Sequence, residues 1–296
     1  MAECAAVEER RITRPALRYH GGKFRLAPWI IDHFPPHRIY VEPFGGAAGV
    51  LLRKPRSHGE VYNDLDGDVV NFFRVLRDAA SRERLIEACL LTPYARADFE
   101  LAWEPSDDAI ERARRTAVRS MMGFGSAGAT KGSTGFRTDT KRAYSTAQFD
   151  WTQYPRNLAA VGERLSGVLI ENRPAIEVMR QHDDQSVLHF VDPPYVHSTR
   201  ATRNTGLRGA YRHEMTDDNH AELLQELQEL QGMVVLSGYP SGIYAGLLSG
   251  WHCVTTQARI SAGRGTGLRT EALWLNPACC QALAGQHGLF SEEAIT

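Results

Sequence analysis

The stretch from residue 187 to residue 195, Val-Leu-His-Phe-Val-Asp-Pro-Pro-Tyr, constrains the fold more than any other part of the sequence. Its apolar and β-branched beginning predicts a short, buried strand. Pro193 and Pro194 end that strand, because neither has a backbone N–H and each fixes φ at about −65°. Asp192 and Tyr195 are therefore expected at the carboxyl end of a strand, which is where ligands bind in open α/β sheets.

A carboxylate, a carbonyl and an aromatic ring held together suit one kind of ligand. The Asp192 carboxylate and the Pro193 carbonyl are both acceptors, and together they match the two protons of an –NH2 group. The Tyr195 ring offers a flat surface to a heterocycle. An exocyclic amine on a purine or pyrimidine fits this description. The alternative is an ordinary turn after a strand, since Pro and Asp are common in turns.

The composition is that of a soluble globular protein with room for an α/β domain and an insertion. The chain has 296 residues, of which 43% are hydrophobic and 23% charged. No apolar run approaches the roughly 20 residues that a membrane span needs. The charged N-terminal residues lack the apolar core of a secretory signal. The five cysteines show no CxxC spacing, so we expect reduced thiols, a cytoplasmic location and no metal.

Basic residues are concentrated in two stretches, although the net charge is only −1. Residues 112–142 contain eight basic residues and one acid, and residues 197–213 contain four arginines and no acid. Such local positive stretches on a neutral protein predict a bounded surface for a polyanion. Two solvated loops are the alternative. The candidate contacts to such a polyanion are Arg119, Lys131, Arg137, Arg200, Arg203 and Arg208.

The segment 39–52 predicts a short strand, a turn of small residues and a helix start, which is typical of a nucleotide-binding βα turn. Its glycines at 45, 46 and 49 do not fit GxGxxG, which disfavours a hydride-transfer enzyme. A second strand over 60–64 ends in Asp64, about 20 residues after the glycines and so placed to bind ribose hydroxyls. Asp66 is the less favoured alternative.

A second glycine pair lies nearer the N-terminus, in Tyr19-x-Gly21-Gly22-Lys23. It is not a P-loop, because it lacks the earlier glycine and the Ser or Thr after the lysine. The glycines still allow the backbone to approach a ligand closely, and Lys23 offers a cation.

The remaining pattern predicts an α/β fold with a Rossmann-like sheet of about seven strands and helices on both faces. Further strands are expected at 168–172, 187–191, 233–237, 251–257 and 270–276, and helices at 66–78, 82–91, 107–122, 174–181 and 216–230. The βα rhythm stops at about residue 81 and resumes at 168. We therefore expect a catalytic domain of residues 15–84 and 156–277, an inserted, mainly helical domain over 85–155, and a tail over 278–296.

Taken together, these motifs resemble those of the Dam-type (D12 class) DNA adenine-N6 methyltransferases, in the same order along the chain. Tyr19-x-Gly21-Gly22-Lys23 resembles the methionine-binding motif of that family, and Glu42-Pro43-Phe44-Gly45-Gly46 resembles its glycine motif. Asn63-Asp64 resembles its ribose motif, and Asp192-Pro193-Pro194-Tyr195 its catalytic motif. Residues 270–277 are also similar to the family, so the resemblance covers about 17–277.

The resemblance implies a site-specific enzyme that transfers a methyl group from S-adenosylmethionine to N6 of a flipped-out adenine in double-stranded DNA. It implies a cofactor site at Tyr19, Lys23, Phe44, Gly45, Asp64 and Asp192, and catalytic roles for Asp192, Pro193, Pro194 and Tyr195. The 85–155 insertion is then the target-recognition domain. A cognate restriction nuclease is a further candidate partner, and a monomer or weak dimer is expected.

One departure and several alternatives remain open. The family often has an acid just after the third strand, whereas this chain has Asn-Arg-Pro-Ala over 172–175, with Pro174 at that place. The alternatives are transfer to cytosine N4, transfer to adenine in RNA, a DNA-binding relative without activity, and a nucleotide-binding metabolic enzyme. The sequence does not reveal which DNA sequence is recognised, because base readout depends on a few unidentified side chains.

Overall fold

The computed structural model describes residues 12–126, 128–129, 134–140, 145–196, 212–262 and 265–291. They form two compact units. The described residues of ranges 1–18 and 71–166 form one, which we call the helical unit. Those of ranges 19–70 and 167–296 form the other, which we call the sheet unit.

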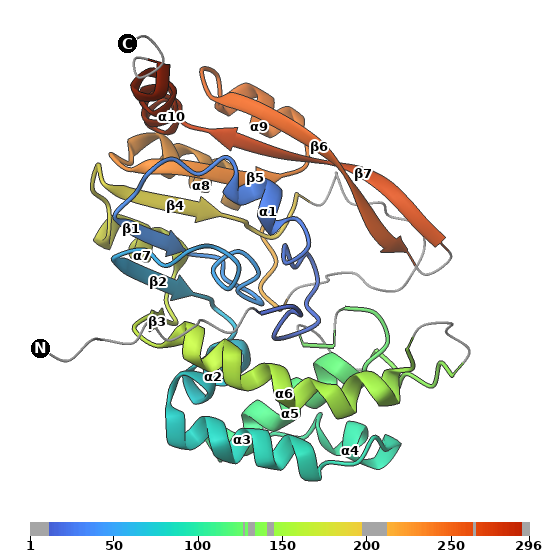
Figure 1. Ribbon diagram of the computed structural model, residues 1–296. Coiled ribbons are helices and arrows are strands. Elements are labelled where there is room, and N and C mark those ends of the chain that lie inside the picture. The colour runs from blue at the N-terminus through green and yellow to red at the C-terminus, as the bar shows by residue number, and fades with distance from the viewer. Residues whose placement is uncertain are drawn as a thin grey trace, which may run out of the picture. The chain divides into compact units, whose positions relative to one another are not determined.

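The sheet unit contains a seven-stranded mixed sheet in the order β3-β2-β1-β4-β5-β7-β6. Its strands are β1 Ile39–Glu42, β2 Gly59–Asn63, β3 Leu169–Glu171, β4 Val187–Val191, β5 Met233–Gly238, β6 His252–Ala262 and β7 Gly265–Leu275. The first five in this order are parallel, while β7 is antiparallel to β5 and β6 (Figure 1). The predicted α/β fold with about seven strands is confirmed. The strands β6 and β7 are longer than predicted because they pair along their whole length.

The strand β4 lies in the middle of the sheet, and every one of its residues is buried. It pairs with β1, where Val41 lies opposite His189, and with β5, where Leu236 lies opposite Val191. Central parallel strands are covered on both faces, which explains why the sequence here is continuously apolar rather than alternating.

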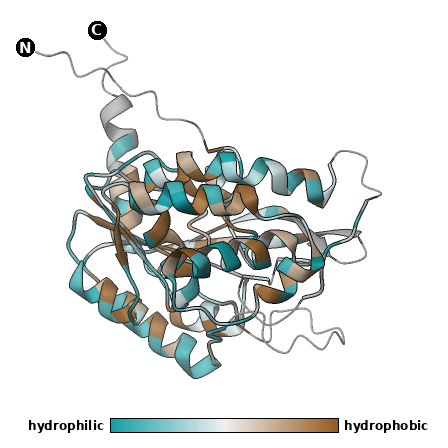
Figure 2. Ribbon diagram, turned by 90° about the horizontal axis from the view of Figure 1, so that it is seen from below, coloured by the Kyte–Doolittle hydropathy of each residue, from teal (hydrophilic) through white to brown (hydrophobic). Residues whose placement is uncertain are grey.

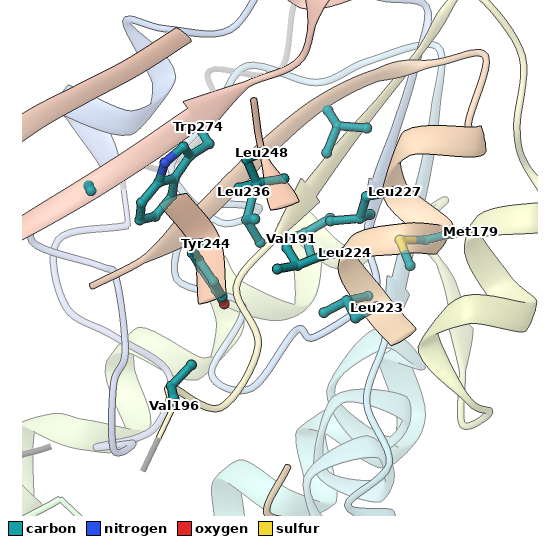
Figure 3. Packing of buried hydrophobic residues seen from close by; sticks show 12 residues of the cluster. Met179, Val191, Val196, Leu223, Leu224, Leu227, Leu236, Tyr244, Leu248 and Trp274 are labelled. Carbon is teal, nitrogen blue, oxygen red and sulfur yellow. The ribbon is translucent and has the colours of Figure 1, made fainter. Parts of the chain in front are cut away.

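The helices of the sheet unit are α1 Ala27–Ile31, α7 Ala175–Gln181, α8 Asp217–Glu229, α9 Gly242–Leu247 and α10 Pro277–Ser291. Apolar residues of α8 pack on one face of the sheet, and an aromatic cluster that includes Phe34, which follows α1, packs on the other. Figure 3 shows the cluster in which Leu224 and Leu227 of α8 lie beside Val191 and Leu236 of the sheet. On the opposite face, Phe34 packs against Tyr40 and Phe190, with ring centroids 5.8 Å apart in both pairs.

The helix α8 begins where the sequence predicts, at Thr216. The Thr216 hydroxyl accepts a hydrogen bond from the Asn219 N–H, and the Asn219 side chain accepts one in return, which completes a capping box. The segment expected to be a tail instead forms α10. The first turn of α10 is held to the sheet, because Cys279 is fully buried and the Asn276 amide donates to the Gly232 carbonyl at 2.9 Å.

The helical unit is built from α3 Ala79–Leu91, α4 Arg96–Leu101, α5 Ala109–Met122 and α6 Ala147–Leu165, and the chain enters it within α2 Gly67–Arg77. Figure 2 shows that these helices carry both hydrophilic and hydrophobic residues, as amphipathic helices do. The Trp151 indole of α6 donates to the Thr92 carbonyl at 2.8 Å, and Tyr154 donates to the Ala16 carbonyl at 2.8 Å. The helix α6 is not among the predicted helices, and it contains Pro155, a residue that usually interrupts a helix.

After α5 the chain is held in a hairpin-like pairing. Phe124 donates its backbone N–H to the Gly135 carbonyl, and Arg137 donates its own to the Met122 carbonyl, each at 2.8 Å. Gly123 has no room for a side chain, because a Cβ there would lie 2.5 Å from the Arg119 carbonyl oxygen. The base of the glycine-rich segment is therefore an ordered part of the helical unit.

Candidate active site

Five parallel strands end at the same edge of the sheet unit, and the predicted site residues follow three of them. The turn with Phe44 and Gly45 follows β1, Asp64 follows β2, and Asp192 follows β4. The carboxyl edge of a parallel sheet is the usual place for a ligand.

The glycine turn after β1 fits tightly against two tyrosine rings. A Cβ at Gly45 would overlap the Tyr62 ring. Gly46 has φ of +47°, and a Cβ there would lie 2.8 Å from the Tyr19 ring. Any side chain at either position would displace a ring, so only glycine fits in this buried turn.

Asp64 is tied to the glycine turn through both oxygens of its carboxylate. Oδ2 accepts from the Gly46 N–H and Oδ1 from the Asp66 N–H, each at 2.8 Å. Burial raises the pKa of Asp64 to about 6, although these two hydrogen bonds oppose the rise. The structure therefore places the predicted ribose acid beside the predicted glycine turn, but with part of its acceptor capacity already used.

Glu42 forms hydrogen bonds to residues before and after the glycine turn, a role that the sequence does not reveal. It is buried, and its Oε2 accepts from the Tyr40 hydroxyl at 2.8 Å and from the Leu51 N–H at 3.0 Å. Burial raises the pKa of Glu42 to about 8, despite these two hydrogen bonds. The Glu42 side chain therefore links β1 to the residues after the turn.

The side chains of Asn63 and Asn172 form hydrogen bonds just after the end of β3, where the family resemblance predicts an acid and this chain has none. The Asn63 side chain donates to the Pro43 carbonyl at 2.9 Å and to the Arg173 carbonyl at 3.0 Å. The Asn172 side chain donates to the Asp64 carbonyl at 2.7 Å. Pro174 precedes the first residue of α7. These contacts connect the ends of β2 and β3 to the turn after β1.

The two charged residues predicted for the catalytic end of the site form an ion pair. Lys23 Nζ lies 3.0 Å from Asp192 Oδ1 and donates to the Gly21 carbonyl at 2.9 Å. Burial lowers the pKa of Lys23, but attraction to Asp192 and Glu271 outweighs it and leaves the pKa above its ordinary value. Burial raises the pKa of Asp192, and Lys23 offsets only part of that rise. The fixed cation favours the ionised form of Asp192.

Tyr195 completes this group and is only 7% exposed. Lys23 Nζ lies 4.6 Å from the centroid of the Tyr195 ring. The Tyr195 hydroxyl donates to Glu271 Oε2 at 2.9 Å and lies 3.3 Å from Ser237 Oγ. The Tyr239 ring meets the Tyr195 ring at 68°, with centroids 4.4 Å apart. Pro193 is buried and Pro194 is partly buried beside them.

Glu271, Ser237 and Tyr239 are site residues that are absent from the sequence-based prediction. Ser237 and Tyr239 lie at the carboxyl end of β5, a position that a predicted strand at 233–237 could have indicated. Glu271 lies in β7 and reaches the same edge only because β7 is antiparallel to β5. No local sequence signal gives that direction.

Two of the predicted DNA contacts are buried within the helical unit. Arg119 is 8% exposed, bonds Thr116 Oγ1 at 3.1 Å and lies over the Trp103 ring at 5.4 Å. Arg137 is 4% exposed and donates to the Met121 carbonyl at 3.3 Å. Lys131, Arg200, Arg203 and Arg208 lie outside the described residues.

Neither a metal site nor a membrane-spanning helix is found in the described part of the chain. Among those residues, His, Cys, Asp and Glu form no group of three that could hold a metal ion. The helices built from them are too short or too polar to cross a bilayer.

Comparison with known proteins identifies the family. The family model of the D12 class N6 adenine-specific DNA methyltransferases matches residues 19–249, which is most of the chain. No curated protein matches the chain. The matched span begins at Tyr19 and contains the glycine turn, Asp64 and the Asp192–Tyr195 motif, so it includes all the residues that meet at the sheet edge except Glu271. The chain therefore belongs to the D12 class of N6 adenine-specific DNA methyltransferases.

Proposed function

We propose that this DNA adenine methyltransferase transfers the methyl group of S-adenosylmethionine to N6 of an adenine that is flipped out of duplex DNA. The observation that carries the proposal is the ion pair between the buried Lys23 and the partly buried Asp192; the backbone of Lys23 packs against Gly49, which follows the glycine turn. An oriented carboxylate close to a turn of small residues supports an amine-binding group beside a cofactor.

The fit to S-adenosylmethionine rests on the glycine turn and on Asp64. The space that a Cβ would take at residues 45 and 46 is filled by tyrosine rings, so the turn is restricted to glycine, as in a nucleotide-binding βα turn. Asp64 is a carboxylate of the kind that binds ribose hydroxyls. The residues that would hold the cofactor are Tyr19, Lys23, Phe44, Gly45, Asp64 and Asp192. When bound, the cofactor supplies an electrophilic methyl group on a sulfonium.

Asp192 and the Pro193 carbonyl would bind the two protons of the adenine amine. The N6 lone pair is delocalised into the ring, and two acceptors on the protons favour a more pyramidal, more nucleophilic nitrogen. A carboxylate has about four acceptor sites, so the contact with Lys23 leaves capacity for the amine. Most of the rate gain would come from orientation, for which about 7–11 kcal/mol is available in principle.

The target adenine must leave the base stack, which costs a few kcal/mol. Stacking of a base on an aromatic side chain recovers about 1–3 kcal/mol. Tyr195 is the predicted platform, and its small exposed surface is extended by Tyr239, which is partly exposed and in contact with it. We propose that the two tyrosines together form the aromatic wall of the base site.

Duplex DNA would be held by the basic stretches. Lys131, Arg200, Arg203 and Arg208 are proposed to contact phosphates, and the helical unit to serve in target recognition. The support is the local excess of basic residues in a chain of net charge −1. The buried side chains of Arg119 and Arg137 are better suited to supporting that unit from within.

The test is a methyl-transfer assay with labelled cofactor and duplex DNA, comparing the parent enzyme with Asp192→Ala. We expect the variant to lose at least about a hundredfold in kcat, because the amine loses a fixed electrostatic partner, while folding and DNA binding persist. Asp218→Ala, which removes an exposed acid from the first turn of α8, is the control and should match the parent. Nucleoside analysis should yield N6-methyladenine. Full activity in Asp192→Ala, or N4-methylcytosine as the product, would contradict the proposal.

A further inference from the structure

Glu271 is a buried carboxylate that lies beyond the residues matched to the family. It is 6% exposed and belongs to β7, whereas the family match ends at residue 249. In the register of β5 and β7, Ser237 lies opposite Leu273. Because side chains alternate along a strand, Glu271 and Ser237 lie on the same face of the sheet. Both reach the hydroxyl of Tyr195.

These contacts hold the Tyr195 ring at its far end. A tyrosine ring turns about two side-chain torsions. A hydrogen bond to its hydroxyl restricts the first, while the second, which turns the ring plane about the axis through the hydroxyl, is restricted by contacts with the ring itself. Glu271 accepts from that hydroxyl at 2.9 Å. The ring also contacts Tyr239 and Lys23. The orientation of Tyr195 is therefore set by residues from β5, β7 and the N-terminal motif as well as by its own loop.

The charge of Glu271 also acts on the Lys23–Asp192 ion pair. Lys23 is buried and is attracted by two carboxylates, Asp192 and Glu271. A buried carboxylate is costly unless it is paired and hydrogen-bonded, and apolar residues of similar size often pack as well or better. If only packing mattered here, a phenylalanine at position 195 and an apolar residue at position 271 would serve as well or better. The presence of a hydroxyl–carboxylate pair instead points to a need for a fixed ring.

We propose that Glu271 is a positioning residue for methyl transfer, which fixes the Tyr195 ring through its hydroxyl so that the target base meets the ring and Asp192 in one orientation. This inference rests on the proposed roles of Tyr195 and Asp192. Ser237 supports the same hydroxyl from β5. Glu271 itself touches no reacting atom, so its effect is expected in turnover rather than in binding.

Four variants test the inference: Tyr195→Phe, Glu271→Ala, Glu271→Gln and the double variant Tyr195→Phe/Glu271→Ala. We expect Tyr195→Phe and Glu271→Ala each to lower kcat about 10- to 100-fold, with the KM for duplex DNA changed by less than about threefold. Glu271→Gln should recover most of the lost turnover, because its amide oxygen still accepts the tyrosine hydrogen bond. The double variant should be no slower than the slower single variant, since both remove one interaction.

Controls separate positioning from a loss of folding. Thermal unfolding and calorimetric binding of S-adenosylhomocysteine are measured for every variant, and Glu229→Gln, at an exposed position in α8, should behave as the parent. If Glu271→Ala does not fold, Tyr195→Phe and Glu271→Gln still decide the matter. Parent-like kcat in Tyr195→Phe, multiplicative losses in the double variant, or a change confined to KM would each overturn the positioning role.

Asp192→Ala, measured in parallel, tells this failure from a failure of the proposed function. An inactive Asp192→Ala together with a fully active Tyr195→Phe overturns only the inference about Glu271. An active Asp192→Ala overturns the proposed mechanism and the inference with it.

Discussion

The buried acid Glu42 and the partly buried acid Asp192 lie at the carboxyl ends of neighbouring strands, and their partners give them different properties. Asp192 faces the cation of Lys23 at 3.0 Å. Glu42 instead accepts from a phenol hydroxyl and a backbone N–H. Burial raises the pKa of Glu42 to about 8, so at neutral pH this side chain is mainly a neutral acid. Glu42 can link β1 to the following residues through hydrogen bonds while it is neutral. The proposed binding of an amine by Asp192 instead needs a negative charge.

The raised pKa of Glu42 predicts how stability depends on pH. Its pKa rises from 4.5 in the unfolded chain to about 8 in the folded enzyme, so the folded form binds the extra proton between these values. Its contribution to stability is present below pH 4.5 and is lost as pH rises toward 8, by up to about 1.4 kcal/mol per pH unit.

Glu42→Gln should remove this dependence, because glutamine keeps an acceptor and cannot ionise. Urea unfolding at about pH 6 and at about pH 8 measures the free energy of unfolding of both proteins. The variant is expected to gain stability relative to the parent as pH rises. An equal difference between the two proteins at both pH values would refute the assignment.

At the scale of elements, the turn after β1 keeps its shape only because residue 45 is a glycine and has no side chain. Gly45→Ala would place a Cβ against the Tyr62 ring, where it cannot be accommodated without moving the ring or the turn. We expect a loss of stability of about 1–3 kcal/mol and at least a roughly tenfold weaker binding of S-adenosylhomocysteine.

The matched control is Gly246→Ala in α9. A Cβ at Gly246 would meet nothing within 4 Å, and alanine is favoured over glycine in a helix by about 1 kcal/mol. Thermal unfolding and calorimetry on both variants separate a general glycine effect from a local one. Unchanged binding of S-adenosylhomocysteine in Gly45→Ala would argue against the turn as the cofactor site.

The elements that follow local rules could be predicted from the sequence. The apolar run 187–191 gives β4, and Thr216 gives the start of α8. The grouping of Lys23 with Asp192 is expected only from the family resemblance, since the two residues are far apart in the chain. Glu271 could not be given a role, because its place depends on the direction of β7. Counting basic residues could not distinguish buried arginines such as Arg119 from exposed ones.

At the scale of the whole molecule, a net charge of −1 means that binding to DNA must come from local positive stretches. Replacing Arg200, Arg203 and Arg208 together by alanine should weaken binding to duplex DNA. The slope of log K against log salt should fall in magnitude by about 0.9 for each phosphate that the variant no longer neutralises. Filter binding over a salt series measures this.

Arg180→Ala provides the control for that experiment. Arg180 is an exposed arginine paired with Glu226 at 2.6 Å, so its removal changes the net charge without touching the basic stretches. Its salt slope should equal that of the parent. A triple variant with an unchanged slope would exclude the 197–213 stretch from the DNA-binding surface.

The antiparallel direction of β7 has a consequence for recombining members of this family. Side chains alternate between the two faces of a strand, so a one-residue deletion between Glu271 and Leu275 would keep the strand apolar but turn the carboxylate to the opposite face. Chimeric enzymes can therefore retain every family motif and still lose the support of Tyr195. Crossover points are best chosen outside this segment, where a difference in length between parents does not change which face Glu271 occupies.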